Sequence, residues 1–228
     1  MTRAILFDTE TTGLEPHLGH RVIEIAALEL ENDLPTGRHF HALVHPDRDI
    51  PDDATRIHGF TIAHLAGKPH FGDIVEDMVA FFGEDPLIAH NAPFDFGFLN
   101  AEFARIGRPP LDRARMVDTL AMAKARFPGM PNSLDALCRR FSIDLSARST
   151  HNALLDCRLL AEVYVELTGG RQRGLSLAAE RSGDAGRPMV RYTATGTRTP
   201  RPITPDAAER AAHAGFIERL KAPIWTVE

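Results

Sequence analysis

The feature that most constrains the fold is a change in the spacing of apolar residues along the chain. Three apolar segments, at residues 3–8, 22–30 and 38–44, lie close together and are separated by turn residues such as Gly13 and Pro35. Segments this close pair most simply as antiparallel strands. The first part of the chain therefore predicts three neighbouring strands of one sheet.

Beyond these segments, the pattern alternates between helix and strand. Residues 71–82 predict an amphipathic helix, because their apolar positions recur three and four residues apart. Short apolar segments at 86–90 and 115–118 predict two more strands. Helices are predicted from residue 91 and over 119–126, 133–141 and 151–168. The order indicates an α/β fold, a mixed five-stranded sheet with helices on both faces. The polar stretch from His45 through Ile57–Phe60 is predicted as a loop.

Length and composition are those of an ordinary globular protein. The 228 residues are 43% hydrophobic and 25% charged, which suits one domain with an appendage. No apolar run approaches the roughly 20 residues of a membrane helix, and the run at residues 4–7 is too short for a signal peptide. Cys138 and Cys157 lack metal-site spacing. We interpret them as buried, reduced thiols and expect a cytoplasmic protein.

Charge divides the chain into an acidic body and a basic tail. Residues 1–168 carry 16 Lys and Arg against 25 Asp and Glu, whereas residues 169–228 carry 10 against 6. We interpret 171–204, which is rich in Gly, Arg, Ser, Thr and Pro, as a flexible basic linker. The segment 205–228 regains helical character around 207–220. Its lone Trp225 is interpreted as a docking anchor, the alternative being a side chain packed onto the body.

Two acids, Asp8 and Glu10, stand two residues apart at the end of the first strand. If the strand continues through them, both side chains point to one face of the sheet. Adjacent carboxylates resist joint ionisation, and a divalent cation such as Mg²⁺ removes the conflict. The alternative is that the two acids only mark the point where the strand reaches the protein surface and a turn begins.

Two further acids and a histidine fall at comparable places. Asp95 lies in the first turn of the helix after the fourth strand, and Asp156 lies in the last helix of the body. Each acid taken alone is better explained as a helix-terminal or exposed residue. His151 would lie roughly 140° from Asp156 on a regular helix. The two can converge only if His151 precedes the first turn, for which Ser149 and Thr150 are suitable caps.

Three motifs carry a resemblance to a known family. Residues 7–13 (Phe-Asp-Thr-Glu-Thr-Thr-Gly), residues 90–95 (His-Asn-Ala-Pro-Phe-Asp) and residues 151–156 (His-Asn-Ala-Leu-Leu-Asp) resemble the motifs of the DEDD 3′–5′ exonucleases. The histidine five positions before the final Asp is typical of the DEDDh branch. Residues 127–138 further resemble the proofreading exonucleases of bacterial replicative polymerases. The likeness spans about residues 3–170, an exonuclease domain expected at 1–170, and implies a ribonuclease H-like fold.

The resemblance implies a two-metal phosphodiesterase with two divalent cations, Mg²⁺ or Mn²⁺. Asp8 would bridge both cations, while Glu10 and Asp156 would hold the one that activates water. Asp95 would support the second cation, and His151 would act as the general base. This agrees with the chemistry, because two cations can stabilise the attacking and leaving oxygens of a phosphoryl displacement, and an imidazole can accept a proton at neutral pH.

Several residues are weaker candidates for contact with the substrate. The threonines Thr9, Thr11 and Thr12 could contact the terminal nucleotide of a DNA 3′ end. His58 is predicted either to approach that end or to be a plain loop histidine. Asn91 is equally well explained as a helix cap.

The tail predicts protein partners. Residues 172–177 (Gln-Arg-Gly-Leu-Ser-Leu) resemble the short peptides by which bacterial polymerase subunits bind the sliding clamp. Gln172, Leu175 and Leu177 would be the contacting residues, although Ala178 stands where an aromatic residue is usual. The segment 205–228, with Trp225, loosely resembles a region that docks on the catalytic subunit of the polymerase. Alternatively, the linker is only a solvated tether.

Together these features predict a 3′–5′ exonuclease that removes mispaired terminal nucleotides from DNA within the replisome. One alternative is a free-standing exonuclease of the same branch that trims RNA or repair intermediates. Another is a non-catalytic adaptor, against which the complete set of catalytic residues argues.

Overall fold

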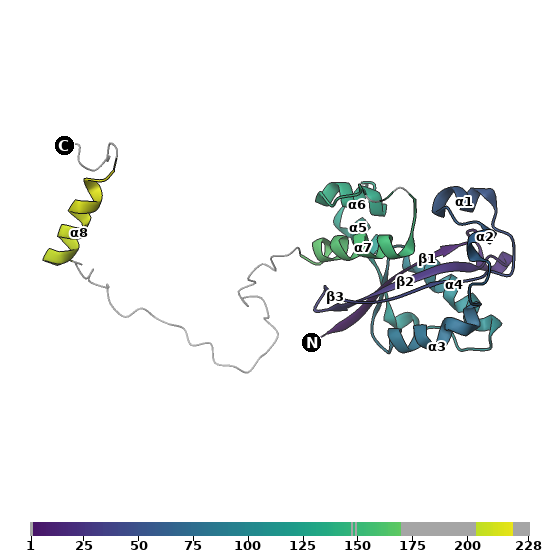
Figure 1. The fold of residues 1–228 in the computed structure, drawn as a ribbon. Coiled ribbons are helices and arrows are strands. Elements are labelled where there is room, and N and C mark those ends of the chain that lie inside the picture. The colour runs from purple at the N-terminus through teal and green to yellow at the C-terminus, as the bar shows by residue number, and fades with distance from the viewer. Residues whose placement is uncertain (1, 147, 149, 170–203, 221–228) are drawn as a thin grey trace. The chain divides into compact units, whose positions relative to one another are not determined.

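In the computed structural model, described residues are 2–146, 148, 150–169 and 204–220 (Figure 1). They fall into two units, a body that ends at residue 169 and a short segment at 204–220. Each unit is described by itself.

The body contains the predicted mixed five-stranded sheet. Its strands are β1 (Arg3–Thr11), β2 (Val22–Glu31), β3 (Leu34–Leu43), β4 (Leu87–Ala89) and β5 (Met116–Asp118). They lie in the order β3-β2-β1-β4-β5. The first three strands pair antiparallel as predicted, and β1, β4 and β5 pair parallel. The central strand β1 therefore has partners on both sides.

The predicted helices are present, with small differences at their ends. They are α3 (Phe71–Phe82), α4 (Ala92–Arg105), α5 (Thr119–Arg126), α6 (Leu134–Phe141) and α7 (Ala153–Leu167). Two short 3₁₀ turns are also present: η1 (Pro16–Leu18) lies between β1 and β2, and η2 (Arg113–Arg115) lies between α4 and β5.

The loop predicted from His45 through Phe60 was only partly correct, because it contains the helix α1 (Asp52–His58). A second helix, α2 (Ile62–Leu65), follows it. Both helices are short, and α1 ends at Gly59, whose φ of 79° favours glycine. One or two turns cannot show the periodicity that identifies a helix from sequence.

Helices cover both faces of the sheet (Figure 1). Alternation along β1 sends Ile5 and Phe7 to the face packed by α3 and α4, and sends Leu6 to the face packed by α5, α6 and α7. All three side chains are fully buried. The two apolar cores fix the sheet between its helices, so residues that end β1 and begin α4 and α7 have defined positions.

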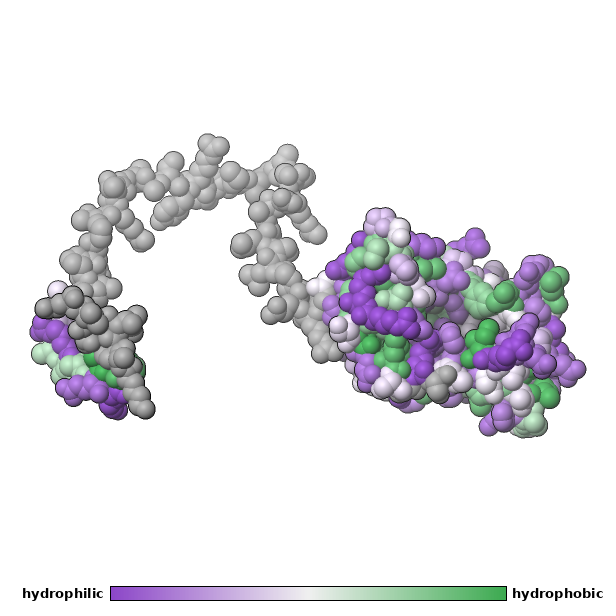
Figure 2. All heavy atoms as spheres, turned by 90° about the horizontal axis from the view of Figure 1, so that it is seen from above, coloured by the Kyte–Doolittle hydropathy of each residue, from purple (hydrophilic) through white to green (hydrophobic). Residues whose placement is uncertain are grey.

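The second unit contains one helix, α8 (Ala207–Ile217), in the region predicted to be helical. Asp206 caps it by accepting a hydrogen bond from the Glu209 N–H at 2.8 Å. Its surface carries both hydrophilic and hydrophobic side chains (Figure 2), including the half-exposed Phe216. Among the described residues, no helix is long and apolar enough to cross a membrane.

Candidate active site

Strand β1 provides the first two acids of the site. It extends through Thr11, so Asp8 and Glu10 both lie within the strand, opposite Ala26 and Glu24 of β2. Strand alternation then places both carboxyl groups on the same face. The predicted geometry of this pair is confirmed.

Asp95 comes from the first turn of α4, which follows β4, the parallel neighbour of β1. Its Oδ1 accepts hydrogen bonds from the Thr9 N–H at 3.1 Å and from the Thr9 Oγ1 hydroxyl at 2.7 Å. Thr9 was predicted as a substrate contact. Its hydroxyl is instead committed to Asp95, which it holds beside β1.

The start of α4 shows that Asn91 has a different role from the predicted side-chain cap. Asn91 occupies the N-cap position in a left-handed conformation (φ 69°), and its side chain makes no cap hydrogen bond. Asp118 Oδ1 accepts from the Asn91 and Ala92 N–H groups, at 3.0 and 3.3 Å. The exposed Asn91 side chain is left available for other contacts.

Asp156 and His151 come from the start of α7. The helix begins at Ala153 with Asn152 as its N-cap, the side chain accepting from the Leu155 N–H at 3.1 Å. Capping by Ser149 and Thr150 was therefore a wrong prediction. His151 does precede the helix, as its convergence with Asp156 required, and its Nδ1 lies 3.4 Å from Asp156 Oδ2.

The acids shift one another's protonation because they share a buried site. Burial, followed by repulsion from Asp95, Glu10 and Asp156, raises the pKa of Asp8 well above its usual range. Burial and repulsion from Asp156 raise the pKa of Glu10 to about 8. Burial raises the pKa of Asp95 to about 7, against the hydrogen bonds from Thr9. Ionising all of these buried, neighbouring carboxyl groups therefore costs free energy, and a bound cation would remove that cost.

The residues fit a hard divalent cation. A carboxylate oxygen of Glu10 lies within 4.8 Å of one of Asp156, and a ring nitrogen of His151 lies within the same distance of both. The surrounding donors are carboxylate oxygens, which Mg²⁺ and Mn²⁺ prefer. The carboxyl groups of Asp8 and Asp95, which repel each other, belong to the same negative cluster.

Arg148 is a site residue that the sequence analysis missed. Its Nε and Nη2 donate to the two Asp156 carboxylate oxygens at 2.6 and 2.7 Å, and Nη2 lies 2.9 Å from His151 Nδ1. Although burial raises the pKa of Asp156, hydrogen bonds from Arg148 and His151 outweigh burial and hold that pKa below its usual value. Nothing distinguishes this arginine in a polar stretch of sequence.

Glu24 is the second missed residue, and here the sequence did contain a signal. It is an acid inside the apolar strand β2 and is fully buried. Its carboxylate accepts from Asn152 Nδ2 at 2.9 Å and from the Ala153 N–H at 3.0 Å, and lies 2.7 Å from His41 Nε2. Glu24 thus attaches the start of α7, and with it Asp156, to the sheet.

Two cavities meet at the acidic cluster, and both are lined by Asp8, His151 and Asp156. One measures about 770 Å³ and extends past His90 and Lys124. The other measures about 610 Å³ and contains four of the predicted substrate contacts in its lining: Thr9, Thr11, Thr12 and His58.

The threonine hydroxyls and His58 already have partners within the protein. Thr11 Oγ1 donates to the Gly13 carbonyl at 2.6 Å, and Thr12 Oγ1 accepts from the Arg21 N–H at 3.0 Å. His58 is buried, and its Nδ1 accepts from the Phe60 N–H at 3.0 Å. Burial lowers its pKa, so the neutral ring carries its proton on Nε2.

The predicted partner residues Gln172, Leu175, Leu177 and Trp225 lie outside the described residues.

Four acids from β1, α4 and α7, with a histidine placed just before the last helix, define a DEDDh-type nuclease site. The family model described as Exonuclease matches residues 5–164. The chain therefore belongs to the Exonuclease family, and it is a 3′–5′ exonuclease, as the resemblance implied.

Individual relatives make the likeness more specific. A DNA polymerase III subunit epsilon from Rickettsia felis is 51% identical over 178 residues, which cover 77% of this chain and 78% of the relative. The solved structure of exonuclease X with 5′ overhanging duplex DNA is 27% identical, with a TM-score of 0.58 over 74% of this chain and 91% of that one. The nuclease domain of 3′hExo, a DEDDh family member bound to rAMP, is 17% identical with a TM-score of 0.60, over 73% and 91% of the two chains, and supports the fold alone.

Proposed function

We propose that this chain removes mispaired 3′-terminal nucleotides from DNA as the proofreading subunit of a bacterial replicative polymerase. The observation that carries the proposal is the meeting of Asp8, Glu10, Asp95 and Asp156 with His151 beside two cavities. The relationship to epsilon subunits at 51% identity favours DNA over other substrates.

The four carboxylates would hold two divalent cations, Mg²⁺ or Mn²⁺. Asp8 would contact both, because its carboxyl group lies close enough to Asp95, Glu10 and Asp156 for each of them to raise its pKa by charge repulsion. When bound, the cations supply positive charge to the attacking and leaving oxygens of the phosphodiester. The raised pKa values of Glu10 and Asp95 support this assignment, since their carboxylates are stable only with added positive charge.

His151 would accept the proton of the attacking water. Its side chain is about half exposed, at 49%, so water reaches the ring. Asp156 Oδ2 lies 3.4 Å from Nδ1 and would stabilise the imidazolium that forms. The His151 N–H donates to the Ile57 carbonyl at 3.1 Å, which fixes the backbone that carries the base.

The terminal nucleotide would occupy the cavity of about 610 Å³. Leu14 and Leu18, which line it, are 74% and 64% exposed and offer an apolar surface to a base. Thr9, Thr11 and Thr12 would contribute mainly through backbone groups and cavity shape, because Thr9 and Thr11 donate their hydroxyl protons within the protein and the Thr12 hydroxyl accepts from the Arg21 N–H. His58 has its Nε2–H available as a donor, and the exposed Asn91 would meet the strand outside this cavity.

The tail would connect the nuclease to the replisome. In this proposal the domain at 1–170 is followed by the basic linker 171–204, whose residues Gln172, Leu175 and Leu177 bind the sliding clamp. The segment 205–228, including Trp225, docks on the catalytic (alpha) subunit of polymerase III. The exposed Phe216 of α8 supports docking, since it is a large apolar side chain on a helix that buries none of its residues.

Two measurements test this function. The first compares nucleotide release from a mispaired DNA primer, a matched primer and a single-stranded RNA, with Mg²⁺, Mn²⁺ or chelator. Faster release from the mispaired DNA supports proofreading, whereas preference for RNA would favour the free-standing trimming enzyme. The second is co-elution with the polymerase catalytic subunit. We expect deletion of 205–228 to abolish it, and failure of the full chain to co-elute would overturn the docking proposal.

A further inference from the structure

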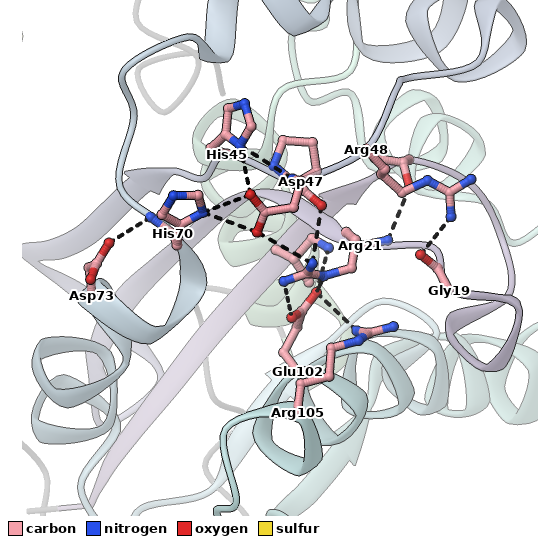
Figure 3. A network of polar contacts seen from close by, with 12 residues as sticks. Gly19, Arg21, His45, Asp47, Arg48, His70, Asp73, Glu102 and Arg105 are labelled. Carbon is pink, nitrogen blue, oxygen red and sulfur yellow. Dashed lines mark hydrogen bonds and ion pairs between the residues drawn. The ribbon is translucent and has the colours of Figure 1, made fainter.

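A second group of metal-ligating side chains lies outside the catalytic cluster. It consists of His45 and Asp47, in the segment after β3, and His70, at the N-cap of α3 (Figure 3). One ligand atom from each residue lies within 4.8 Å of the other two. None of the three residues has a role in the proposed exonuclease mechanism.

Both imidazole rings place Nδ1 close to the Asp47 carboxylate, and His45 Nδ1 also accepts from the Asp47 N–H at 3.3 Å. His45 Nδ1 lies 3.2 Å from Asp47 Oδ1, and His70 Nδ1 lies 3.1 Å from the same oxygen. The ring centroids are 5.4 Å apart, with the planes nearly perpendicular. Three potential metal ligands, from two separate segments of the chain, thus lie close together.

The backbone holds this arrangement in place. The His45 N–H donates to the Pro69 carbonyl at 2.9 Å, which joins the segment after β3 to the residue before His70. The His70 N–H donates to Asp73 Oδ2 at 2.8 Å, which fixes the start of α3. A metal ion would therefore meet ligand atoms that are already largely in position. Its binding would require little further ordering of the chain, so little conformational entropy would be lost.

The two nitrogen–oxygen separations are compatible with a tetrahedral transition-metal site. With Zn–N and Zn–O bonds of about 2.0–2.2 Å, neighbouring ligand atoms of a tetrahedron lie about 3.3 Å apart. The observed nitrogen–oxygen separations of 3.1 and 3.2 Å are close to that value. Two imidazoles with one carboxylate select Zn²⁺ and similar ions over Mg²⁺, which prefers oxygen ligands.

The charges around the group are compatible with a bound cation. Arg21 Nη1 lies 3.7 Å from an Asp47 oxygen, but its guanidinium is bound mainly to the buried Glu102, at 2.8 and 2.9 Å (Figure 3). Asp47 and His70 are about half exposed, at 49% and 56%, so an ion can enter and keep a water ligand. Because Arg21 remains close, a site here would bind more weakly than a buried structural zinc site.

We propose that His45, Asp47 and His70 form a three-ligand site for a borderline divalent transition metal, with Zn²⁺ as the preferred ion and water in the fourth position. The bound ion would join the end of β3 to the start of α3, and so stabilise the packing of that helix on the sheet.

The test uses the full chain, freed of metal by a chelator and then kept in millimolar Mg²⁺ so that the carboxylate cluster is occupied. Zn²⁺ is titrated by calorimetry into the wild type, His45→Ala and His70→Ser, the last because serine keeps a good N-cap. His39→Ser, on the exposed part of β3, is the matched control. All four proteins are repeated with Asp8→Ala, which weakens zinc binding at the catalytic cluster.

We expect the wild type and His39→Ser to bind one more Zn²⁺ than His45→Ala or His70→Ser, in both backgrounds. Zn²⁺ should raise Tm by several degrees more in the first pair than in the second, and Co²⁺ should give the visible absorption of a tetrahedral site in the first pair. Circular dichroism checks that each variant is folded. Equal zinc stoichiometry in all four folded proteins would overturn the proposal and leave a hydrogen-bonded His–Asp–His group.

Discussion

Divalent-metal binding should expel protons from the carboxyl cluster, and the raised pKa values of its members set the smallest number of protons released. At pH 7, Glu10 with a pKa of about 8 is about nine-tenths protonated, and Asp95 with a pKa of about 7 is about half protonated. Both must be ionised to bind a metal. Saturation with Mg²⁺ or Mn²⁺ should therefore release at least about one proton per chain, and the raised pKa of Asp8 increases the number.

Calorimetry measures this release directly. The binding heat is determined at pH 7 in two buffers with different ionisation enthalpies, and the difference gives the protons exchanged. Glu10→Gln should lose most of one released proton, whereas the matched control Glu76→Gln, an exposed acid of α3, should behave as wild type. Metal affinity should also rise with pH up to about 8, where Glu10 becomes ionised. Binding without proton release would refute the electrostatic account.

The same shifts set a dependence of stability on pH. Because the folded pKa of Glu10, about 8, exceeds its ordinary value of 4.5, its protonated form is favoured by folding. That contribution is complete below about pH 4.5 and is lost as pH rises through about 8. In chelator, the free energy of unfolding should fall by a few kcal/mol across this window, and Mg²⁺ should reduce the fall. Stability that rises across the window would contradict the shift.

Three further predictions concern single residues. His151→Ala should lower the rate of nucleotide release by at least about 100-fold with little change in metal affinity; a large loss of metal affinity would instead make His151 a ligand. Arg148→Ala should increase Mg²⁺ affinity in calorimetry, because it removes a positive charge bound to Asp156; weaker Mg²⁺ binding would contradict this competition. Glu102→Leu should destabilise the fold by about 3 kcal/mol in chemical denaturation, because it leaves Arg21 without its buried partner; a loss below about 1 kcal/mol would contradict it.

The parts of the site that could be predicted are those that depend on residue spacing within a short stretch of sequence. The i, i+2 spacing of Asp8 and Glu10 and the apolar run before them place both acids on one face of a strand. The requirement that His151 precede its helix follows from helical geometry alone. The three strands at the start of the chain were predictable because their apolar runs are long and their separations short.

What could not be predicted depends on contacts between distant segments. Arg148 reaches Asp156 and His151 from a polar stretch with no periodicity. The hydroxyl of Thr9 turns to Asp95, 86 positions away, so its role as a positioning group was not visible in the sequence. Capping of α4 comes from Asp118 in the next strand, rather than from Asn91 at the helix start. In each case the tertiary partner, and not the local sequence, decides the role.

The central claim is that the acids at the end of β1, with Asp95 and Asp156, form a metal-dependent site that cuts DNA from the 3′ end. The most direct measurement follows a 5′-labelled primer with a mispaired terminus, with the full chain in Mg²⁺ or Mn²⁺. Wild type and Asp77→Ala, an exposed acid of α3, should shorten the primer from its 3′ end one nucleotide at a time. Asp8→Ala should release none, and chelator should stop all release. Undiminished release by folded Asp8→Ala would contradict the account.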